Sequence, residues 1–270
     1  MVREADAASF EKPAEAYDRF VGRYGSSLAH SLIERVGLEP EWAVLDVGCG
    51  PGQLSAVLAE SVGAANVAAV DPSESFVRAC RARVPGADVR VAAAEALPFA
   101  DGSFDATLSQ LVVNFLSDAP AGLDEMRRVT RPQGTIAGSV WDYAGEMTML
   151  RAFWDAAGEV DPTAAEASDE GARMPYCRPE TLADLWMQAG LLDVATEAIV
   201  VRAAYEDFED LWLPFTSGVG PAGAFCASLS EPDREALKAS YYERLGSPEG
   251  AFELSARAWT ACGTLPGRSG

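Results

Sequence analysis

Residues 44–55 read VLDVGCGPGQLS, and the rest of the chain can be placed around them. The stretch begins as an apolar, β-branched run, which is typical of a buried parallel strand. Three glycines follow, Gly48, Gly50 and Gly52, and apolar residues at helical spacing begin at Leu54. Because glycine accepts positive φ and lets a ligand approach the backbone, this order predicts a strand, a ligand-binding turn and the N-terminus of a helix.

The spacing of the glycines limits which classes of ligand the turn could bind. The dinucleotide fingerprint is Gly-x-Gly-x-x-Gly, and here the pattern is Gly-x-Gly-x-Gly, one residue shorter. No lysine follows at the position that a triphosphate-binding loop requires. The alternative at this stage is a glycine turn that closes a strand–helix corner and binds nothing.

Composition restricts the class of protein. A length of 270 residues suits one large α/β domain or a domain with an insertion, and the net charge of −20 argues against binding to nucleic acid or an anionic membrane. No two of the five cysteines have Cys-x-x-Cys spacing, which predicts a reducing cytoplasm and no disulfide or metal site. The acidic start predicts no signal peptide, and no run approaches the ~18 apolar residues of a membrane span.

An acidic residue follows the second predicted strand, residues 66–70. Asp71 comes about twenty residues after the glycine turn, where a carboxylate can accept hydrogen bonds from the two hydroxyls of a ribose. Pro72 and Ser73 come next. The alternative is that Asp71 only caps the helix predicted over residues 74–83, a role that Ser73 also suits.

The remaining elements follow from periodicity and from turn residues. Two helices are predicted in residues 11–36, with Tyr17 and Tyr24 in the first and an apolar stripe from Leu28 to Val36 in the second. Further strands are predicted at residues 88–92, 104–109, 135–140, 194–204 and 252–262, and further helices at 121–130, 146–157, 180–189, 206–213 and 231–245. Residues 158–175 lack periodicity and predict a mobile loop or lid, and the last two predicted helices flank a glycine-rich segment, Gly218–Gly223.

Three motifs together carry a family resemblance. Besides the glycine turn they are residues 93–99, AAEALPF, and residues 131–134, RPQG. With the Tyr-Asp pair at Tyr17, these motifs resemble the class I S-adenosylmethionine-dependent methyltransferases. Within that family the chain is most similar to the small-molecule group that includes the ubiquinone and menaquinone C-methyltransferases. The specific motifs cover residues 43–141.

The resemblance implies a fold and a cofactor. The fold is α/β, a Rossmann-like, doubly wound, seven-stranded mixed sheet with helical insertions, whose last strand is antiparallel and lies beside strand five. The alternation of strands and helices up to Val140 agrees with this. The chain is then a single domain, 1–270, with cap helices at 11–36, a cofactor-binding core at 42–142, and lid or substrate insertions at 143–178 and 205–250.

S-adenosylmethionine is the implied cofactor, and the resemblance gives its contacts. The predicted cofactor-binding residues are Tyr17, Tyr24, Asp46, Gly48, Cys49, Gly50, Gly52, Asp71, Pro72, Ser73, Ala94, Glu95, Gln110, Leu111 and Val112. Ala93 stands where the family has Asp or Asn, so adenine is expected to contact the backbone at Ala94 and Glu95.

An acceptor pocket is predicted beyond the carboxyl ends of strands four and five. Its predicted residues are Asn114, Phe115, Trp141, Tyr143, Trp212 and Phe215. An apolar wall with few polar groups is typical of sites for small organic molecules. No catalytic residue is identified: Asp142, Tyr143 and Tyr17 are candidates for a base by position only.

Methyl transfer to a small molecule is therefore the expected reaction. The alternatives are a non-catalytic cofactor-binding or partner protein of the same fold, and a nucleotide-dependent oxidoreductase, which the glycine spacing disfavours. Acceptor atom and oligomeric state are left open by the sequence.

Overall fold

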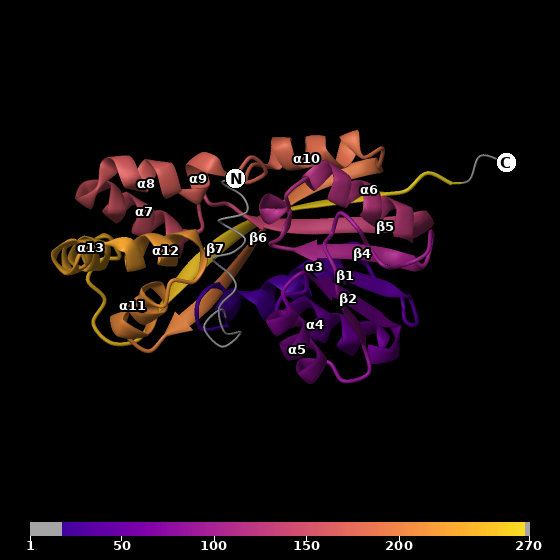
Figure 1. The fold of residues 1–270 in the computed structure, drawn as a ribbon, viewed down its shortest axis with the longest axis horizontal. Helices are drawn as coiled ribbons and strands as arrows, with labels where there is room; N and C mark the ends of the chain where they lie inside the picture. The colour runs from indigo at the N-terminus through magenta and orange to yellow at the C-terminus, as the bar shows by residue number, and fades with distance from the viewer. Residues whose placement is uncertain (1–17, 268–270) are drawn as a thin grey trace. The chain divides into compact units, whose positions relative to one another are not determined.

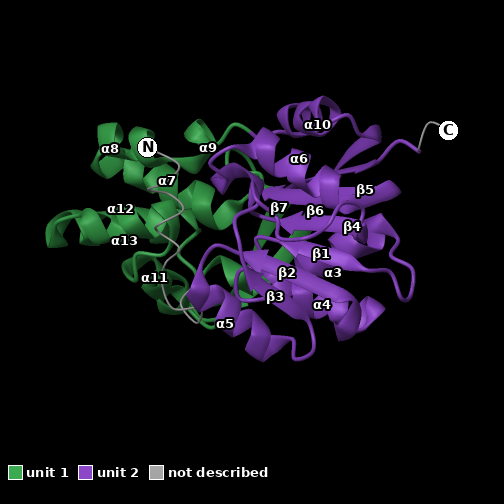
Figure 2. Ribbon diagram, turned by 45° about the vertical axis from the view of Figure 1, so that its right-hand side comes forward, with its two compact units in different colours: residues 1–24, 141–175, 200–257 green, residues 25–140, 176–199, 258–270 purple. Residues whose placement is uncertain are grey.

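The computed structural model describes residues 18–267 of the chain. It forms two compact units, shown in Figure 2. Unit 2 consists of residues 25–140, 176–199 and 258–270. Unit 1 consists of residues 1–24, 141–175 and 200–257. Three of the five boundaries fall at the end of one strand and within two others, so these strands contribute residues to both units.

A seven-stranded sheet runs through the described chain. Its strands are β1 (Val44–Val47), β2 (Val67–Asp71), β3 (Asp88–Val91), β4 (Phe104–Gln110), β5 (Thr130–Trp141), β6 (Leu192–Tyr205) and β7 (Phe252–Thr264), in the spatial order β3-β2-β1-β4-β5-β7-β6. Strands β1 to β5 pair in parallel. The predicted fold class, a mixed seven-stranded Rossmann-like sheet, is confirmed.

The last strand takes the position that the resemblance implied. β7 lies between β5 and β6 in the sheet. Gln133 N donates to Leu265 O at 3.2 Å, and Met147 forms an antiparallel bridge with Ala256. Residue numbers rise along β5 as they fall along β7, so the two strands are antiparallel.

Helices cover both faces of the sheet in unit 2 (Figure 1). They are α3 (Gly25–Val36), α4 (Gln53–Val62), α5 (Glu74–Arg83), α6 (Ala119–Val129) and α10 (Pro179–Gln188), with the short 3₁₀ turns η2 (Ala64–Asn66) and η3 (Val113–Phe115). The main core packs Leu45 and Val47 of β1 against apolar residues of α6 and α10, including Leu123 and Trp186. A smaller cluster on α5 includes Ala69, Val77 and Cys80.

Unit 1 is mainly helical and rich in buried aromatic rings. Its helices are η1 (Val21–Tyr24), α7 (Thr148–Val160), α8 (Pro162–Ser168), α9 (Glu170–Arg173), α11 (Phe208–Thr216), α12 (Gly220–Ser228) and α13 (Glu231–Arg244). Phe153 of α7 stacks on Phe215 of α11 with centroids 4.4 Å apart, and Tyr241 of α13 meets both rings edge-on. The aromatic residues predicted from the insertion therefore make up much of this unit's interior.

The expected loop at residues 158–175 is wrong, because α8 and α9 occupy most of it. Asp161 accepts a hydrogen bond from Ala164 N at 3.0 Å, and Asp169 accepts one from Gly171 N at 2.8 Å. The acidic and proline residues that suggested a loop are helix-starting signals instead.

A helix that the sequence did not predict, α12, begins at Gly220 within the glycine-rich segment. A Cβ on Gly223 would lie 2.9 Å from the backbone carbon of Gly218, so glycine is needed there for close packing of the chain.

Strand five starts earlier than predicted, at Thr130, and includes the RPQG segment. Residues 11–17 of the predicted first helix lie outside the described residues.

Candidate functional site

The glycine turn has the backbone geometry that its sequence predicts. Gly48, Gly50 and Gly52 have φ values of +75°, +52° and +93°. Gly48 N and Cys49 N both donate to Val70 O, at 2.8 and 2.9 Å. The turn is thereby fixed to the end of β2, next to the predicted ribose-binding segment.

The three glycines differ in what surrounds them. A Cβ on Gly48 would lie 2.4 Å from the Val112 side chain, and one on Gly52 would lie 2.8 Å from the Cys80 sulfur. A Cβ on Gly50 would meet nothing within 4 Å. Gly50 is therefore the glycine whose side faces open space, where a ligand can approach the backbone.

Asp71 is hydrogen-bonded to this turn. Its Oδ2 accepts from Gly50 N at 2.9 Å, and its Oδ1 accepts from Ser73 N at 2.8 Å. Burial raises the pKa of Asp71, and the two backbone hydrogen bonds oppose that shift. Ser73, and not Asp71, caps α5, with its hydroxyl accepting from Phe76 N. The capping alternative for Asp71 is thus wrong, and each carboxylate oxygen retains a lone pair for a ligand.

Asp46 belongs to a buried pair that the sequence analysis missed. Ser55 Oγ of α4 donates to Asp46 Oδ2 at 2.6 Å, while Asp46 Oδ1 has no partner. Burial is the main cause that raises the pKa of Asp46 to about 7, and nearby Asp71 adds to the shift. The available signal was a serine on the apolar face of the helix that follows the glycine turn, between Leu54 and Leu58.

Unpartnered polar atoms occur near the carboxyl ends of β1, β4 and β5. Among the described residues, unit 2 has five buried side-chain atoms without a hydrogen-bond partner: Asp46 Oδ1, Ser109 Oγ, Gln110 Oε1, Asn114 Nδ2 and Ser139 Oγ. Gln110 and Ser139 are paired in register on these two strands. An unmade hydrogen bond in a buried site costs about 1–3 kcal/mol, and ligands bind at this edge of open α/β sheets. The cluster therefore indicates a polar ligand.

The segment after β4 is held in an unusual conformation. Gln110 Nε2 donates to Gly25 O at 3.0 Å, and Leu111 N donates to Ser139 O at 2.7 Å. Leu111 has φ of +65°, which is rare for a branched residue and is typical of ligand-binding positions. Val112 then packs on Gly48, so this segment and the glycine turn are adjacent.

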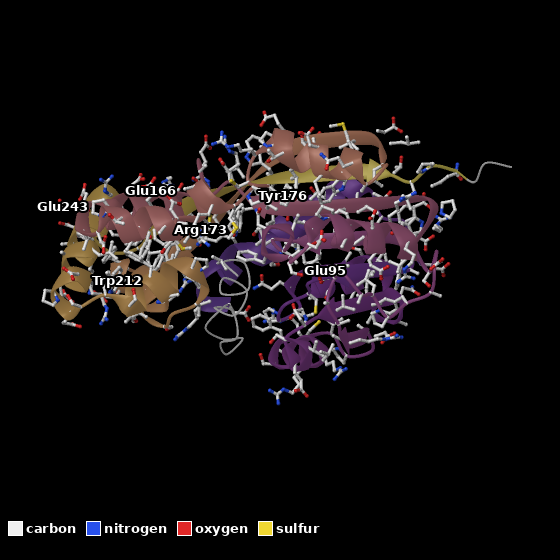
Figure 3. All side chains as sticks on the ribbon, turned by 45° about the horizontal axis from the view of Figure 1, so that its top comes forward. Glu95, Glu166, Arg173, Tyr176, Trp212 and Glu243 are labelled. Atoms are coloured by element: carbon white, nitrogen blue, oxygen red, sulfur yellow. The ribbon has the colours of Figure 1, made fainter. Side chains whose placement is uncertain are left out.

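In the segment predicted to contact adenine, the side chain of Glu95 is hydrogen-bonded within the protein. Glu95, labelled in Figure 3, accepts hydrogen bonds from Ser117 Oγ at 2.7 Å and Asp118 N at 3.1 Å. Burial opposes ionisation of Glu95, but these hydrogen bonds outweigh it and lower its pKa. Ala94 is buried in the main core. Any contact from Ala94 and Glu95 to adenine is thus left to the backbone.

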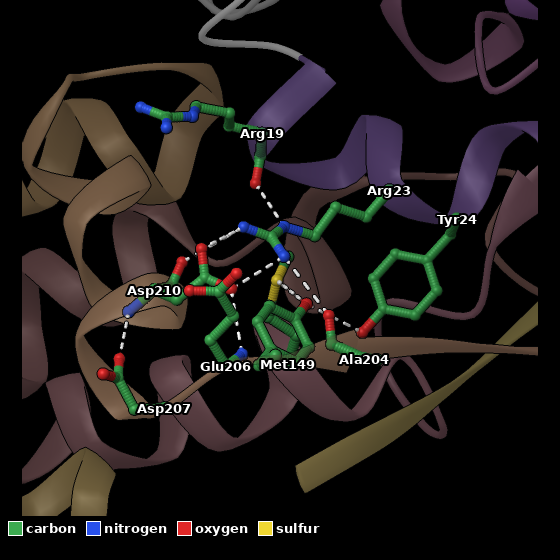
Figure 4. Close-up of polar contacts among 9 residues, drawn as sticks. Arg19, Arg23, Tyr24, Met149, Ala204, Glu206, Asp207 and Asp210 are labelled. Atoms are coloured by element: carbon green, nitrogen blue, oxygen red, sulfur yellow. Dashed lines mark hydrogen bonds and ion pairs between the residues drawn. The ribbon is translucent and has the colours of Figure 1, made fainter. Parts of the chain in front are cut away.

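The two predicted tyrosine contacts have different outcomes. Tyr17 lies outside the described residues. Tyr24 belongs to unit 1 and is fully buried, with its hydroxyl 3.0 Å from that of Tyr205. Tyr205 in turn donates to Met149 Sδ at 3.4 Å, beside the ion pair of Arg23 and Asp210 (Figure 4). Burial raises the pKa of Tyr24 to about 12, so the phenol stays protonated at neutral pH.

The six predicted acceptor residues are distributed over both units. Asn114 and Phe115 belong to unit 2, and Asn114 Oδ1 accepts from Tyr176 N at 3.0 Å. Trp141, Tyr143, Trp212 and Phe215 belong to unit 1, and all four are buried. Trp212, labelled in Figure 3, and Phe215 are part of the aromatic cluster of that unit. A pocket shared by these six residues stays a prediction.

Asp142, one of the three positional candidates for a base, already accepts hydrogen bonds within the protein. Asp142 Oδ2 accepts from Arg257 at 2.7 Å and from Glu146 N at 2.8 Å. Within the described range no group of three or more metal-ligating side chains is found, and none of its helices is long and apolar enough to cross a membrane.

Comparisons with known proteins agree with this geometry. Residues 45–138 match the family described as "Methyltransferase domain". A malonyl-[acyl-carrier protein] O-methyltransferase of Halorhodospira halophila is 31% identical over 258 residues, which is 92% of this chain and 79% of that protein. The chain belongs to the class I S-adenosylmethionine-dependent methyltransferase family. The predicted family is thereby confirmed, whereas the narrower resemblance to quinone methyltransferases stays a prediction.

Other relatives and solved structures extend the comparison. A malonyl-[acyl-carrier protein] O-methyltransferase of Pseudescherichia vulneris is 32% identical over 57% of this chain, and the match spans 60% of that relative's length. A putative methyltransferase from an antibiotic biosynthesis pathway of Anabaena variabilis has a TM-score of 0.61 at 19% identity, covering 87% of this chain and 96% of that chain. A putative methyltransferase from Bacillus halodurans has a TM-score of 0.58 at 17% identity, covering 89% of this chain and 99% of that chain. At such identities the structures show the fold alone.

Proposed function

We propose that this chain transfers the methyl group of S-adenosylmethionine to a small organic molecule. The observation that carries the proposal is the open side of Gly50 beside the buried Asp71 carboxylate, at the edge of the sheet where unpartnered polar atoms collect. A carboxylate next to a glycine turn suits the ribose of an adenosyl cofactor. Family membership supports the same cofactor.

The bound cofactor supplies an activated methyl group on a sulfonium centre. The task left to the chain is to hold two reactants in line, which can be worth ~7–11 kcal/mol. Asp71 binds the ribose hydroxyls, and Gly50 leaves space for the rest of the adenosyl group. Asp46 Oδ1 and Gln110 Oε1 are acceptors for the cofactor's ammonium group, since both are buried and unpartnered.

The acceptor that we propose is a carboxylate oxygen. The named relatives are malonyl-[acyl-carrier protein] O-methyltransferases, and a malonyl group ends in a carboxylate. Asn114 fits this chemistry, because its Oδ1 is fixed by Tyr176 N and its buried Nδ2 is left as an unpartnered donor. A carboxylic acid is already ionised near neutral pH, so no base is needed to activate it. The engagement of Asp142 by Arg257 is compatible with such a reaction.

Calorimetry with S-adenosylmethionine and with NAD tests the cofactor. We expect binding of the first and none of the second; the reverse would support an oxidoreductase. Detection of S-adenosylhomocysteine after incubation with a panel of mono- and dicarboxylic acids tests the reaction. Binding of the cofactor with no product from carboxylates, amines or phenols would favour the non-catalytic alternative.

Asn114→Asp tests the acceptor class, because it replaces the amide donor with a negative charge. We expect turnover of a carboxylate substrate to fall at least tenfold while cofactor affinity stays near that of the wild type. Unchanged turnover would contradict the carboxylate assignment.

The single domain, the small-molecule partner and the cytoplasmic location also remain proposals.

A further inference from the structure

Ser139 has a buried hydroxyl to which the proposed function gives no role. It lies near the carboxyl end of β5, it is 0% exposed, and its Oγ has no hydrogen-bond partner among the described residues. Ser139 O accepts from Leu111 N at 2.7 Å, so the backbone at this point is tied to the end of β4. A buried hydroxyl without a partner lowers stability, which indicates that a ligand supplies the missing hydrogen bond.

Ser139 lies beside Gln110 on the same face of the sheet. The two residues are paired in register on parallel strands, which places their backbones about 4.8 Å apart with both side chains on one side. Asp46 of β1 belongs to this face too, because it is paired with Leu108, two residues before Gln110. Three polar side chains therefore follow one another across β1, β4 and β5.

The orientation of the Gln110 amide is fixed by the start of α3. Its Nε2 donates to Gly25 O at 3.0 Å, and a carbonyl oxygen can only accept, so Oε1 is the atom left for a ligand. Asp46 is held in a similar way, with Ser55 donating to its Oδ2 and its Oδ1 unpartnered. Both unpartnered atoms are acceptors and suit a positively charged donor. The hydroxyl of Ser139 differs from them, because it can also donate.

Charge determines which part of the cofactor suits Ser139. The amino-acid end of S-adenosylmethionine carries an ammonium and a carboxylate on the same carbon. The carboxylate of Asp46 attracts the first and repels the second. Ser139 lies two strands away from β1, about 10 Å across the sheet, and its hydroxyl is an uncharged donor. The cofactor carboxylate is therefore best placed on the β5 side, next to Ser139.

We propose that the Ser139 hydroxyl donates a hydrogen bond to the carboxylate of the bound cofactor, while Gln110 accepts from the ammonium. The two side chains then bind the amino-acid end in one orientation and favour adenosyl ligands that keep both charges. This role of Ser139 rests on the proposed function, because S-adenosylmethionine is taken as the ligand.

Calorimetry with three thioether ligands tests the role of Ser139. They are S-adenosylhomocysteine, its decarboxylated form, which keeps the ammonium, and its deaminated form, which keeps the carboxylate. Ser139→Ala should bind S-adenosylhomocysteine about tenfold or more weakly than the wild type, because a hydrogen bond to a charged group is lost. The deaminated form should lose affinity by a similar factor, and the decarboxylated form should bind to both proteins alike. A purely structural role of Ser139 would change all three affinities together.

The stability of the ligand-free protein gives a second measurement. Ser139→Ala removes a hydroxyl that bonds nothing in the described part of the chain, so the melting temperature should not fall. Thr260→Val is the control, since Thr260 is buried in β7 and its hydroxyl donates to Glu197 O at 3.1 Å. That change should lower the melting temperature, because Glu197 O loses its donor, and should leave all three affinities unchanged.

Equal affinity of folded Ser139→Ala and the wild type for S-adenosylhomocysteine would overturn the role of Ser139. An equal loss for the decarboxylated form would overturn it as well, because the hydroxyl would then not act on the carboxylate. Should Ser139→Ala fail to fold, Ser139→Cys makes the same comparison, because a thiol is a weaker donor. A wild-type protein that binds none of the three ligands overturns the proposed function itself.

Discussion

Asp71 shows how one side chain serves both the turn and the proposed ligand. Its two oxygens accept from Gly50 N and Ser73 N, and only 7% of the residue is exposed. The carboxylate is therefore positioned before any ligand arrives. A preorganised group loses little entropy on binding, which favours affinity.

Asp71→Ala should weaken S-adenosylmethionine binding by about ten- to a hundredfold. A charge-assisted hydrogen bond is worth roughly 1.5–3 kcal/mol, and here two backbone N–H groups also lose their acceptor. Some loss of stability is expected for that second reason. Calorimetry on the folded variant measures the affinity, and a thermal melt measures the stability.

Asp161→Ala is the matched control for Asp71, since it also removes a carboxylate that accepts from a backbone N–H, at the start of α8. It should lower stability and leave cofactor affinity unchanged. Wild-type affinity in folded Asp71→Ala would reject the ribose role.

Asp46 should give the protein a measurable pH dependence of stability. Its pKa rises from an ordinary 3.8 to about 7 in the folded state, mainly because of burial. Between these values the folded state binds more protons than the unfolded state, so the free energy of unfolding falls as pH rises from about 4 to about 7. The slope is at most about 1.4 kcal/mol per pH unit.

Asp46→Asn isolates this contribution, because asparagine does not titrate. Urea unfolding of both proteins at about pH 5 and about pH 7.5 should show a steeper loss for the wild type. If the free energy of unfolding changes by the same amount between the two pH values in both proteins, Asp46 is ionised throughout this range in the folded state.

At the scale of elements, β5 and α10 pack closely because residue 138 of β5 is a glycine and has no side chain. A Cβ on Gly138 would lie 2.8 Å from the Trp186 ring. Trp186 is fully buried and donates its Nε1 to Ile136 O at 3.1 Å, so the indole cannot easily move aside. Glycine at residue 138 therefore sets how closely the helix approaches the strand.

Gly138→Ala should destabilise the protein by about 1–3 kcal/mol through overpacking. Gly158→Ala is the control: this glycine lies in α7, and its added Cβ would meet nothing within 4 Å. That change should be stabilising by up to about 1 kcal/mol, because alanine favours helix. Equal denaturation midpoints for the two variants would show that the Trp186 contact is not restrictive.

At the scale of the whole molecule, the open question is whether the aromatic rings of Trp212 and Phe215 belong to the hydrophobic core or line a substrate pocket. Trp212 and Phe215 pack in a cluster with Phe153 and Tyr241, which supports a role in the interior of unit 1. The pocket prediction assigns the same rings to the acceptor. Only measurements of turnover separate these roles.

Trp212→Ala and Tyr143→Ala should reduce turnover of an identified substrate while leaving cofactor affinity near wild type, if the rings line the acceptor pocket. Phe225→Ala is the matched control, because Phe225 packs in the same cluster against Phe153 and is not among the predicted pocket residues. It should lose stability only. A loss of stability alone in all three variants would assign Trp212 and Tyr143 to the core.

The sequence by itself determined the parts of this protein that depend on local backbone preference. The succession of strands and helices along the chain up to β5, the positive φ of three glycines and the acidic residue at the end of β2 follow from short stretches with strong patterns. Family resemblance added the antiparallel last strand, which no local pattern contains.

Only the tertiary structure decided which distant side chains meet. Ser55 with Asp46, Cys80 against Gly52 and Trp186 against Gly138 are contacts between different elements, and nothing in the spacing along the chain specifies them. The sequence also failed to predict α8 and α9. Asp161 and Asp169 cap these helices, but aspartates are also common in loops, and only the hydrogen bonds in the structure distinguish the two cases. Local pattern fixes each element, whereas the site depends on how the chain packs, and packing is non-local.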